Sequence, residues 1–506
     1  MRHNDSAEIG DKPVLVTGAS GYIGSRLVPA LLEKGHRVRA CARNVNKLKG
    51  RAWTEHERVE LAEADLMDRA SLSAAMEGCF AAYFLVHSMS PKNSDFEQTD
   101  RTAANNFSDC AGAAGLRRII YLSGLGEDSP SLSAHLRSRH EVGQILRQGR
   151  TPVTILRAAM IIGSGSASFE IMRYLVDRLP VMITPKWVRT TVQPIAVRNV
   201  LEYLAGALTV EEMAGNTYDI GGPRPVTYQQ LFGIYAAEAG LRRRIIIPVP
   251  VLTPRLSSYW IALVTPAPAA LARPLAEGLA NKVVVTDDSI RRLIPVRLLD
   301  YPEAIRRALE KIGKGEVESS WRDAGETPPP EWASASDAEY AGGTLFKETH
   351  TLTVKGDRGK LWSRIERIGG AEGWPYGNLL WKARGMIDRM FGGFGQARGR
   401  RSATALRVGD AMEMWRVTEI VPMKKISLRS EMILPGEAAL ILEILDADPA
   451  AEGILKLRLT AWMAPSGLAG IIYWYLVMPL HRLVFPGTLK NLARQGSAVA
   501  LKSEMA

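Results

Sequence analysis

The sequence predicts an α/β protein, in which a parallel sheet covered by helices on both faces is followed by a second, α+β domain. Three observations support this fold class. Short β-branched runs alternate with helical stretches from Pro13 to about Leu241, which is typical of consecutive βαβ units. The segment Gly325–Tyr340 has the Pro, Ser and acidic content of a linker. From Leu345 onward, runs of alternating hydrophobicity precede a long apolar stretch, as in a sheet that packs on a helix.

The strands expected in the first domain follow one another with helical stretches between them. They are the runs VLVT, RVRACAR, RVELAEADL, AAYFLVHS, RRIIYLSG and TPVTILRAAMI. The resulting boundaries are 12–322 for the first domain, with 242–322 as a Pro-rich extension on the substrate side, 323–344 for the linker and 345–506 for the second domain. A chain of 506 residues is long enough for two large domains.

The amino-acid composition excludes several classes of protein. With 46% hydrophobic residues, the chain is not wholly disordered. Its three cysteines, Cys41, Cys79 and Cys110, have no metal-ligand spacing, so we expect no metal site and a reducing compartment. The first twelve residues are polar and lack the apolar core of a signal peptide, so we expect a cytoplasmic protein.

A glycine-rich loop, Gly18-x-x-Gly21-x-x-Gly24, follows the first expected strand and opens a helix. Gly18 permits the tight turn, Gly21 lets the backbone approach a pyrophosphate, and Gly24 lets the helix pack on the strand. A second strand follows at the required distance, so the pattern predicts a Rossmann-type dinucleotide site rather than a plain structural turn. The predicted cofactor contacts in this loop are Gly18, Ser20, Gly21, Tyr22, Ile23 and Gly24.

The end of the second strand indicates which dinucleotide is bound. An acidic residue there would bind the ribose 2′-hydroxyl of NAD, but the segment RVRACAR contains none. Arg43 could instead bind a 2′-phosphate through its fork of N–H donors. The alternative is that Arg43 is a solvated surface residue. We therefore predict that NADP(H) is preferred over NAD(H).

Together with Ala64-Asp65-Leu66 after the third strand, these features resemble the atypical short-chain dehydrogenase/reductase family. The likeness is closest to its NmrA-like and complex-I-subunit-like branch. The resemblance implies that Asp65 and Leu66 lie against the adenine. It also implies that the residues after the fourth strand, Val86, His87 and Ser88, line the cofactor channel. The arrangement of both domains resembles a bacterial group of such proteins whose C-terminal domain has no known function.

The catalytic pattern of that family is missing from this chain. Active members use Tyr-x-x-x-Lys about a dozen residues after a Ser that follows the fifth strand, and no Tyr-x-x-x-Lys occurs here. Ser123 occupies the Ser position, and His135-x-x-x-Arg139 stands where the Tyr and Lys are expected. Either His135 is the proton donor and Arg139 anchors the cofactor, or the two residues are solvated or contact the cofactor without chemistry.

The family resemblance and the missing catalytic pattern together leave three functions open. The first is an NAD(P)H-dependent oxidoreductase or epimerase that acts on a small, partly apolar substrate near Ser123 and His135. The second is a non-catalytic NADP(H)-bound sensor or assembly factor, and the absence of the Tyr/Lys pair favours this alternative. The third is a lipid- or quinone-handling protein at the membrane surface.

The second domain has the pattern of a helix-grip fold, in which a curved antiparallel sheet wraps one long helix. It resembles the START-like superfamily, mostly through the segment HRLVFPGTLKNLAR. Pro479 and Pro486 argue against one unbroken helix. Several aromatic residues could line an apolar pocket or could simply pack in the core. They are Trp362, Trp374, Trp381, Trp415, Trp462, Tyr473, Trp474 and Tyr475.

The positive charge is concentrated in the second domain. The chain carries a net +11, and from Gly342 onward 23 basic residues face 15 acidic ones, which leaves only +3 for the first 341 residues. The region 382–401 is the most basic, so we expect contact with an anionic membrane or an acidic partner there, or a solvated loop, and no nucleic-acid binding. The uncharged stretch Leu459–Leu480 is split by Pro465-Ser466-Gly467, which favours a buried or interfacial helix over a membrane span.

Overall fold

The computed structural model of the chain separates into two compact units, Met1–Gly325 and Glu326–Ala506. The residues it describes are 12–49, 51–87, 96–126, 133–249, 261, 277–279, 281–313, 346–396, 400–447, 453–465 and 467–505. The expected linker, Ser88, Arg398 and much of the Pro-rich extension lie outside this described part.

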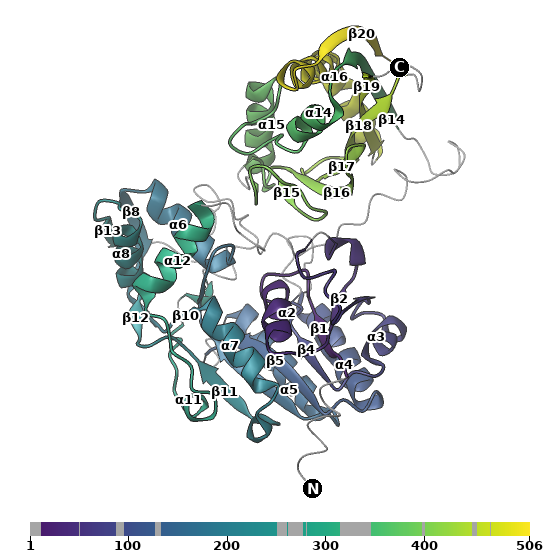
Figure 1. Cartoon of the computed structure of the whole chain (residues 1–506). Coiled ribbons are helices and arrows are strands. Elements are labelled where there is room, and N and C mark those ends of the chain that lie inside the picture. Colours follow the sequence, from purple (N-terminus) through teal and green to yellow (C-terminus); the bar gives the residue numbers. More distant parts are fainter. Residues whose placement is uncertain are drawn as a thin grey trace. The chain divides into compact units, whose positions relative to one another are not determined.

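The first unit is built on a seven-stranded parallel sheet with the order β11-β6-β5-β4-β1-β2-β3 (Figure 1). The chain fills one half of the sheet with β1 to β3 and then crosses to the other side of β1 with β4, which is the point where such folds bind nucleotides. The predicted parallel α/β fold is thus confirmed. The strands are β1 Val14–Thr17, β2 Val38–Ala42, β3 Val59–Glu63, β4 Ala81–Phe84, β5 Arg118–Gly124, β6 Val153–Ala158 and β11 Thr217–Ile220.

Helices cover both faces of this sheet, and each face has its own apolar core (Figure 1). One core includes residues of α2 and α7, and the other includes residues of α3, α4 and α5. Because both faces are covered, the strands are apolar almost throughout, as their sequences indicated. These helices are α2 Gly24–Glu33, α3 Arg69–Met76, α4 Phe96–Ala113, α5 Ala134–Gln148 and α7 Val197–Ala207. The short helix η1 spans Val45–Lys47.

A smaller group of elements beyond β6 has a third core, in which α6, α8 and α12 pack together. Short strands within this group pair with one another and form three two-stranded sheets. The elements are β7 Ile161–Ile162, α6 Ala167–Arg178, β8 Val181–Pro185, η2 Lys186–Arg189, β9 Thr191–Val192, β10 Ile195–Ala196, β12 Val226–Thr227, α8 Tyr228–Glu238, β13 Ile245–Val249 and α12 Tyr301–Gly313. Two further short helices, η3 Glu211–Met213 and α11 Ile290–Leu293, pack into the core of α2 and α7 instead.

The second unit is a seven-stranded antiparallel sheet, in the order β15-β16-β17-β18-β19-β14-β20, with one long helix packed on it. This is the helix-grip layout that the sequence predicted. Its elements are β14 Phe346–Lys355, α14 Arg358–Ile365, α15 Asn378–Met390, β15 Ala411–Met412, β16 Trp415–Val421, β17 Lys425–Ser430, β18 Gly436–Asp446, β19 Ile454–Pro465, α16 Gly467–Gln495 and β20 Val499–Met505.

The prediction that proline would interrupt the final helix is wrong, because α16 runs through both Pro479 and Pro486. Each proline removes one N–H from the helical ladder and so releases the carbonyl four residues earlier. Those carbonyls belong to Tyr475 and Arg482, which are both solvent-exposed, so water can bind them. The uncharged stretch is divided between β19 and α16 as expected, and no helix in the described residues has the length and apolar content to cross a membrane.

Candidate active site

The glycine loop between β1 and α2 has the geometry of a phosphate-binding turn. Gly18 adopts a φ of +70°, and a Cβ there would lie 3.0 Å from the carbonyl oxygen of Leu85. A Cβ on Gly24 would lie 2.3 Å from the carbonyl oxygen of Gly18, so a side chain at either position would distort the turn. The N–H of Gly21 donates to the Gly18 carbonyl at 2.8 Å and closes the turn. The N–H of Ser25 donates to the Gly21 carbonyl at 3.2 Å and the N–H of Leu27 to the Ile23 carbonyl at 2.9 Å, so the turn runs directly into α2. The N-terminus of a helix carries a partial positive charge that attracts an anion.

The other residues predicted to contact the cofactor in this loop are Ser20, Tyr22 and Ile23, and each has a different neighbour. Ser20 accepts a hydrogen bond on its carbonyl from Arg51 at 3.1 Å. Ile23 packs against the core below α2. The Tyr22 ring lies under the guanidinium of Arg26 at 4.3 Å, so it also supports the loop from the side.

The end of β2 carries basic rather than acidic side chains. Arg43 is exposed there, Lys47 lies one helical turn further on, in η1, and Arg51 reaches the glycine loop as described above. The nearest carboxylate, Glu63 at the end of β3, accepts the backbone N–H of Val45 at 3.0 Å. Sequence reasoning singled out Arg43 but missed Lys47 and Arg51, although the four-residue spacing of all three was available as a signal.

The loop after β3 is held in place by its own polar contacts. The carboxylate of Asp65 accepts the N–H of Met67 at 3.0 Å, and the side chain of Asn106 donates to the carbonyl of Leu66 at 2.9 Å. On the other side of β1, the side chain of Val86 lies against the Gly18 turn, 3.4 Å from where a Cβ would be. The predicted cofactor contacts after β3 and β4 therefore lie at the same edge of the sheet as the loop.

Two histidines and an aspartate form a chain of hydrogen bonds at this edge. His87, which follows β4, has its Nδ1 3.0 Å from Oδ2 of Asp100 on α4 and its Nε2 3.1 Å from Nδ1 of His135 on α5. The hydroxyl of Ser138 donates to the same Asp100 oxygen at 3.0 Å. The Asp100 carboxylate can only accept, so it fixes the proton of His87 on Nδ1 and leaves Nε2 as an acceptor for His135.

Both imidazoles are held in the neutral form. Burial is the main cause that lowers the pKa of His87, and the positive charge of Arg139 adds to it, while Asp100 opposes it. Burial also lowers the pKa of His135 well below its usual value, and His87 and Arg139 contribute in the same direction. A neutral imidazole with Nδ1 engaged presents its remaining nitrogen, Nε2 of His135, as a proton acceptor.

Arg139 lies beside these histidines and is held by backbone. Its Nη1 donates to the carbonyl of Leu122 at 3.1 Å, while its Nε is buried and has no acceptor among the described residues. The hydroxyls of Tyr121 and Ser123 both donate to the carbonyl of Arg139, at 3.0 and 3.4 Å. Ser123 is therefore turned toward α5 and buried, and Tyr121 is a buried residue of β5.

The site fits a nicotinamide dinucleotide. The glycine turn has no room for side chains where the pyrophosphate would approach, basic residues follow β2, and the buried Nε of Arg139 still needs an acceptor. These features lie at the carboxyl ends of neighbouring parallel strands, where dinucleotides bind in this fold.

Comparison with protein families agrees with this geometry. Residues 18–174 match the NAD(P)H-binding family, and residues 340–488 match a family described as protein of unknown function, DUF2867. The chain joins an NAD(P)H-binding Rossmann domain to a DUF2867 domain. The His87–Asp100–His135 chain lies within the matched part of the NAD(P)H-binding domain.

Curated relatives match over a short region. Cinnamoyl-CoA reductase 1 of Petunia hybrida is 38% identical over 125 residues, which are 23% of this chain and 37% of the relative. Dihydroflavonol 4-reductase of Hordeum vulgare is 34% identical over 124 residues, which are 22% and 35% of the two chains. This chain thus spans little more than a third of the length of these relatives.

Solved structures resemble the first domain. The triphenylmethane reductase of Citrobacter sp. complexed with NADP(H) is 20% identical, with a TM-score of 0.48, over 58% of this chain and 99% of that one. The NADPH-dependent quinone oxidoreductase QOR2 of Escherichia coli is 18% identical, with a TM-score of 0.48, over 58% and 98% of the two chains.

The DUF2867 domain contains an apolar cavity between α15, α16 and the inner face of β18 and β19. Five of the eight predicted aromatic residues line it: Trp381, Trp415, Trp462, Tyr473 and Trp474. Trp362 and Trp374 are buried in the core instead, and Tyr475 is exposed. The sequence predicted a cavity but could not assign each ring to the cavity, the core or the surface.

Proposed function

We propose that the protein is an NADP(H)-dependent oxidoreductase that interconverts a carbonyl and a hydroxyl group on a small, partly apolar substrate. The observation that supports this most is the chain from Asp100 through His87 to His135, which ends at the position where the resembled family has its catalytic Tyr. Bound NADP(H) would supply or accept the hydride. The reductase relatives named above support this class of reaction and make aromatic aldehydes, thioesters and ketones the first substrates to try.

The hydrogen-bonded chain gives His135 a means of moving a proton. When a substrate hydroxyl is oxidised, Nε2 of His135 takes its proton and the charge spreads along the chain toward Asp100 as Nδ1 of His135 passes a proton to His87. In the reverse direction the protonated Nε2 returns the proton to the oxygen that forms when hydride reaches the carbonyl carbon. Arg139 holds the cofactor through its free Nε donor rather than taking part in the proton transfer.

The basic residues after β2 support a preference for NADP(H). Arg43 is exposed directly after β2 and Lys47 follows it in η1, so the segment that would face the ribose is basic, and Glu63 accepts a backbone N–H there.

A substrate panel with a matched histidine control tests this function. Purified protein is incubated with NADPH and a panel of aldehydes, quinones, aromatic ketones and thioesters, and NADPH oxidation is followed at 340 nm. We expect turnover with at least one member and a loss of about 10²–10⁴-fold in kcat for His135→Gln, with unchanged NADPH affinity. His36→Gln, which changes another partly buried histidine at the opposite edge of the sheet, should retain full activity. If nothing in the panel is reduced and NADPH still binds tightly, a non-catalytic sensor or assembly factor is the better description.

We also propose that the DUF2867 domain contacts the surface of an anionic membrane, because two of its helices expose apolar faces. On α15, Leu379, Met386 and Met390 are 79%, 66% and 80% exposed, although exposed helix faces are normally polar. Helix α16 also exposes apolar side chains to solvent. These α16 residues are Ile472, Tyr475, Leu476, Leu480 and Leu483. Residues of both helices line the same cavity.

The charges around these faces match an anionic surface. Helix α16 has no acidic residue, and the single acidic residue of α15, Asp388, is buried. Lys382 on α15 and Arg482 on α16 are exposed beside the apolar side chains. The arginines further along the 382–401 region are partly engaged within the domain, since Arg401 binds Asp410 through two hydrogen bonds of 2.8 and 2.9 Å. The helices, more than that loop, offer the membrane contact.

Vesicle sedimentation tests the membrane proposal. We expect the protein to sediment with vesicles of phosphatidylcholine and phosphatidylglycerol, less at high salt, and to lose most binding in Met386→Glu/Met390→Glu. Met67→Glu, which changes a similarly exposed methionine of the first domain, should sediment like the unmodified protein. If the double variant instead abolishes self-association, and vesicles never bind, the apolar faces form a protein interface and the proposal is wrong.

A further inference from the structure

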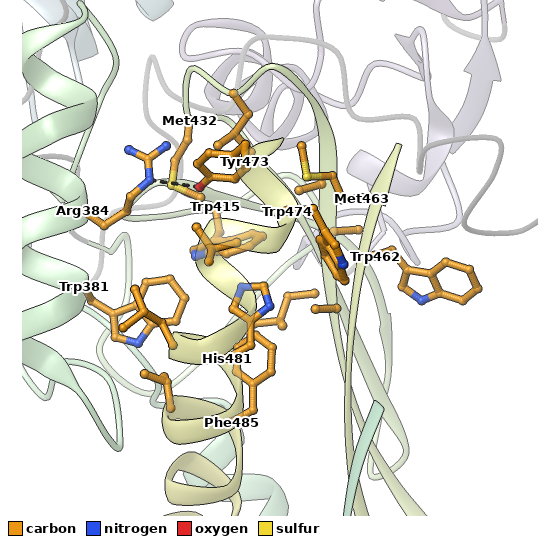
Figure 2. Close-up of a pocket in the computed structure, with 18 of the residues that line it drawn as sticks. Trp381, Arg384, Trp415, Met432, Trp462, Met463, Tyr473, Trp474, His481 and Phe485 are labelled. Atoms are coloured by element: carbon orange, nitrogen blue, oxygen red, sulfur yellow. Dashed lines mark hydrogen bonds between the residues drawn. The ribbon is translucent and has the colours of Figure 1, made fainter. Parts of the chain in front are cut away.

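The cavity of the DUF2867 domain has a volume of about 130 Å³ (Figure 2). Cavities of roughly 150 Å³ lined by apolar side chains accept a single benzene ring. Figure 2 shows the rings of Trp381, Trp415, His481 and Phe485 gathered around one space. Its size and aromatic lining therefore suit one six-membered ring.

Two indole N–H groups at this cavity have no acceptor. Nε1 of Trp415 and Nε1 of Trp381 are both buried, and neither has a hydrogen-bond partner among the described residues. Trp415 itself is only 5% exposed. The neighbouring Trp374 shows the usual arrangement, because its Nε1 donates to Glu413 at 2.8 Å. A buried donor without an acceptor is destabilising, so these two N–H groups indicate that an oxygen atom completes the site.

His481 brings an acceptor to the same cavity. Its Nδ1 lies 3.2 Å from one carboxylate oxygen of Glu348, and the other oxygen is 2.8 Å from Nε2 of His350. The two imidazoles lower the pKa of Glu348 to about 2, although its burial acts in the opposite direction, so the carboxylate is ionised and can only accept. With its proton on Nδ1, toward this carboxylate, the His481 ring leaves Nε2 on its other side to accept a hydrogen bond.

We propose that this cavity binds a monocyclic phenol, whose ring lies among the tryptophans and whose hydroxyl is bound by Trp381, Trp415 and His481. A phenolic oxygen accepts up to two hydrogen bonds and donates one. The two indole N–H groups and Nε2 of His481 supply the matching two donors and one acceptor. Glu348 is a positioning residue, which orients His481 from outside the cavity. This site is separate from the proposed oxidoreductase site, and neither proposal depends on the other.

Calorimetric titration of the full-length protein with phenol and with toluene tests the proposal. The two probes have nearly the same size, and only phenol carries an oxygen. We expect phenol to bind about tenfold more tightly than toluene, because only phenol satisfies the buried polar groups. Equal affinity for the two probes would overturn the proposal and leave a purely apolar cavity, and failure of both to bind would overturn it as well.

Three variants test whether phenol binds in this cavity. Trp415→Phe keeps an aromatic ring but removes the N–H, and His481→Asn removes the acceptor from the middle of the cavity. Each should weaken phenol binding about three- to tenfold and leave toluene binding unchanged. Trp362→Phe, which changes a buried core tryptophan that does not line the cavity, should bind phenol like the unmodified protein.

The same titration distinguishes this site from the active site of the first domain. Phenol binding that survives both Trp415→Phe and His481→Asn but is lost in His135→Gln would place the phenol in the oxidoreductase site and contradict the proposal. Should Trp415→Phe fail to fold, as judged by circular dichroism, the His481→Asn result alone decides.

Discussion

Each domain contains a cluster of two histidines and one carboxylate, and the two clusters are connected differently. In the NAD(P)H-binding domain the order is carboxylate, histidine, histidine, so that Asp100 lies at one end and His135 at the other. In the DUF2867 domain Glu348 lies in the middle and binds one histidine with each oxygen. The linear chain can pass a proton from one end to the other, whereas the central carboxylate holds both imidazoles in one orientation.

The electrostatic consequences differ in the same way. In the linear chain burial lowers the pKa values of both histidines, and the cation of Arg139 adds to this effect while Asp100 opposes it. In the branched cluster two imidazoles face a single carboxylate, and it is the pKa of Glu348 that is lowered. The arrangement of identical side-chain types therefore decides whether the cluster suits proton transfer or positioning.

The largest expected effect is on catalysis, and it should be confined to the linear cluster. Asp100→Asn keeps the shape of the side chain but no longer fixes the proton of His87 on Nδ1, so we expect kcat to fall about 10²–10⁴-fold. Glu348→Gln, the equivalent change in the branched cluster, should leave kcat within about twofold. Steady-state kinetics with the best substrate of the panel measures both. Equal losses in the two variants would show that the clusters do not differ in role.

The next effect concerns the cofactor. Arg43→Ala should weaken NADPH binding about 10–100-fold, because one charge-assisted contact with the 2′-phosphate is lost, and should leave NADH binding unchanged. Fluorescence titration with both cofactors measures this preference. Lys49→Ala, which removes an exposed cation two residues beyond Lys47, serves as the control for nonspecific electrostatic loss. An equal loss of NADH affinity would contradict a contact between Arg43 and the 2′-phosphate.

The sequence was informative where a rule is local and weak where function depends on tertiary contacts. The loop from Gly18 to Gly24 could be predicted because its turn, helix start and glycine spacing are neighbours in the chain. Asp100 could not, because it lies on α4 without any motif and meets His87 only through packing of α4 on α5. His87 was expected at the cofactor channel, but its contact with His135, 48 residues away, required the fold.

The same limit applied to the second domain. The antiparallel sheet and the long helix follow from hydrophobic periodicity, which is a local property. Which tryptophans retain a free N–H cannot be read from composition, because Trp374 and Trp415 differ only in whether a carboxylate such as Glu413 lies nearby. The two prolines led to a wrong prediction for α16, because the free-energy cost of a proline within a helix depends on whether the carbonyl that it leaves unbonded is exposed to water.

A smaller effect concerns the stability of the DUF2867 domain in acid. The folded pKa of Glu348, about 2, lies below its unfolded value of 4.5, so its contribution is complete above pH 4.5 and is lost as the pH falls toward 2. Glu348→Gln should lower the free energy of unfolding of this domain by about 1–3 kcal/mol at pH 7 and should flatten its decline below pH 4.5. Hydrogen exchange of peptides from β14 and α16 measures the domain separately from the rest of the chain. An unchanged acid profile in the variant would contradict the ionised, doubly bonded carboxylate.

The smallest expected effect is the corresponding pH dependence of the first domain, and its window is different. The folded pKa values of His87 and His135 lie below the unfolded value of 6.5, so folding favours the neutral imidazoles, and the stability they contribute is lost as the pH falls below 6.5. At pH 5.5, one unit below that value, the loss is at most about 1.4 kcal/mol per imidazole. Hydrogen exchange of peptides from α5 should therefore quicken between pH 7.5 and 5.5 by more than the intrinsic rate predicts. His135→Gln should remove part of this dependence. Glu348 stays ionised throughout that range, so its own contribution to the second domain should not change there. A common pH window for both domains would mean that the two clusters titrate alike, whatever their connectivity.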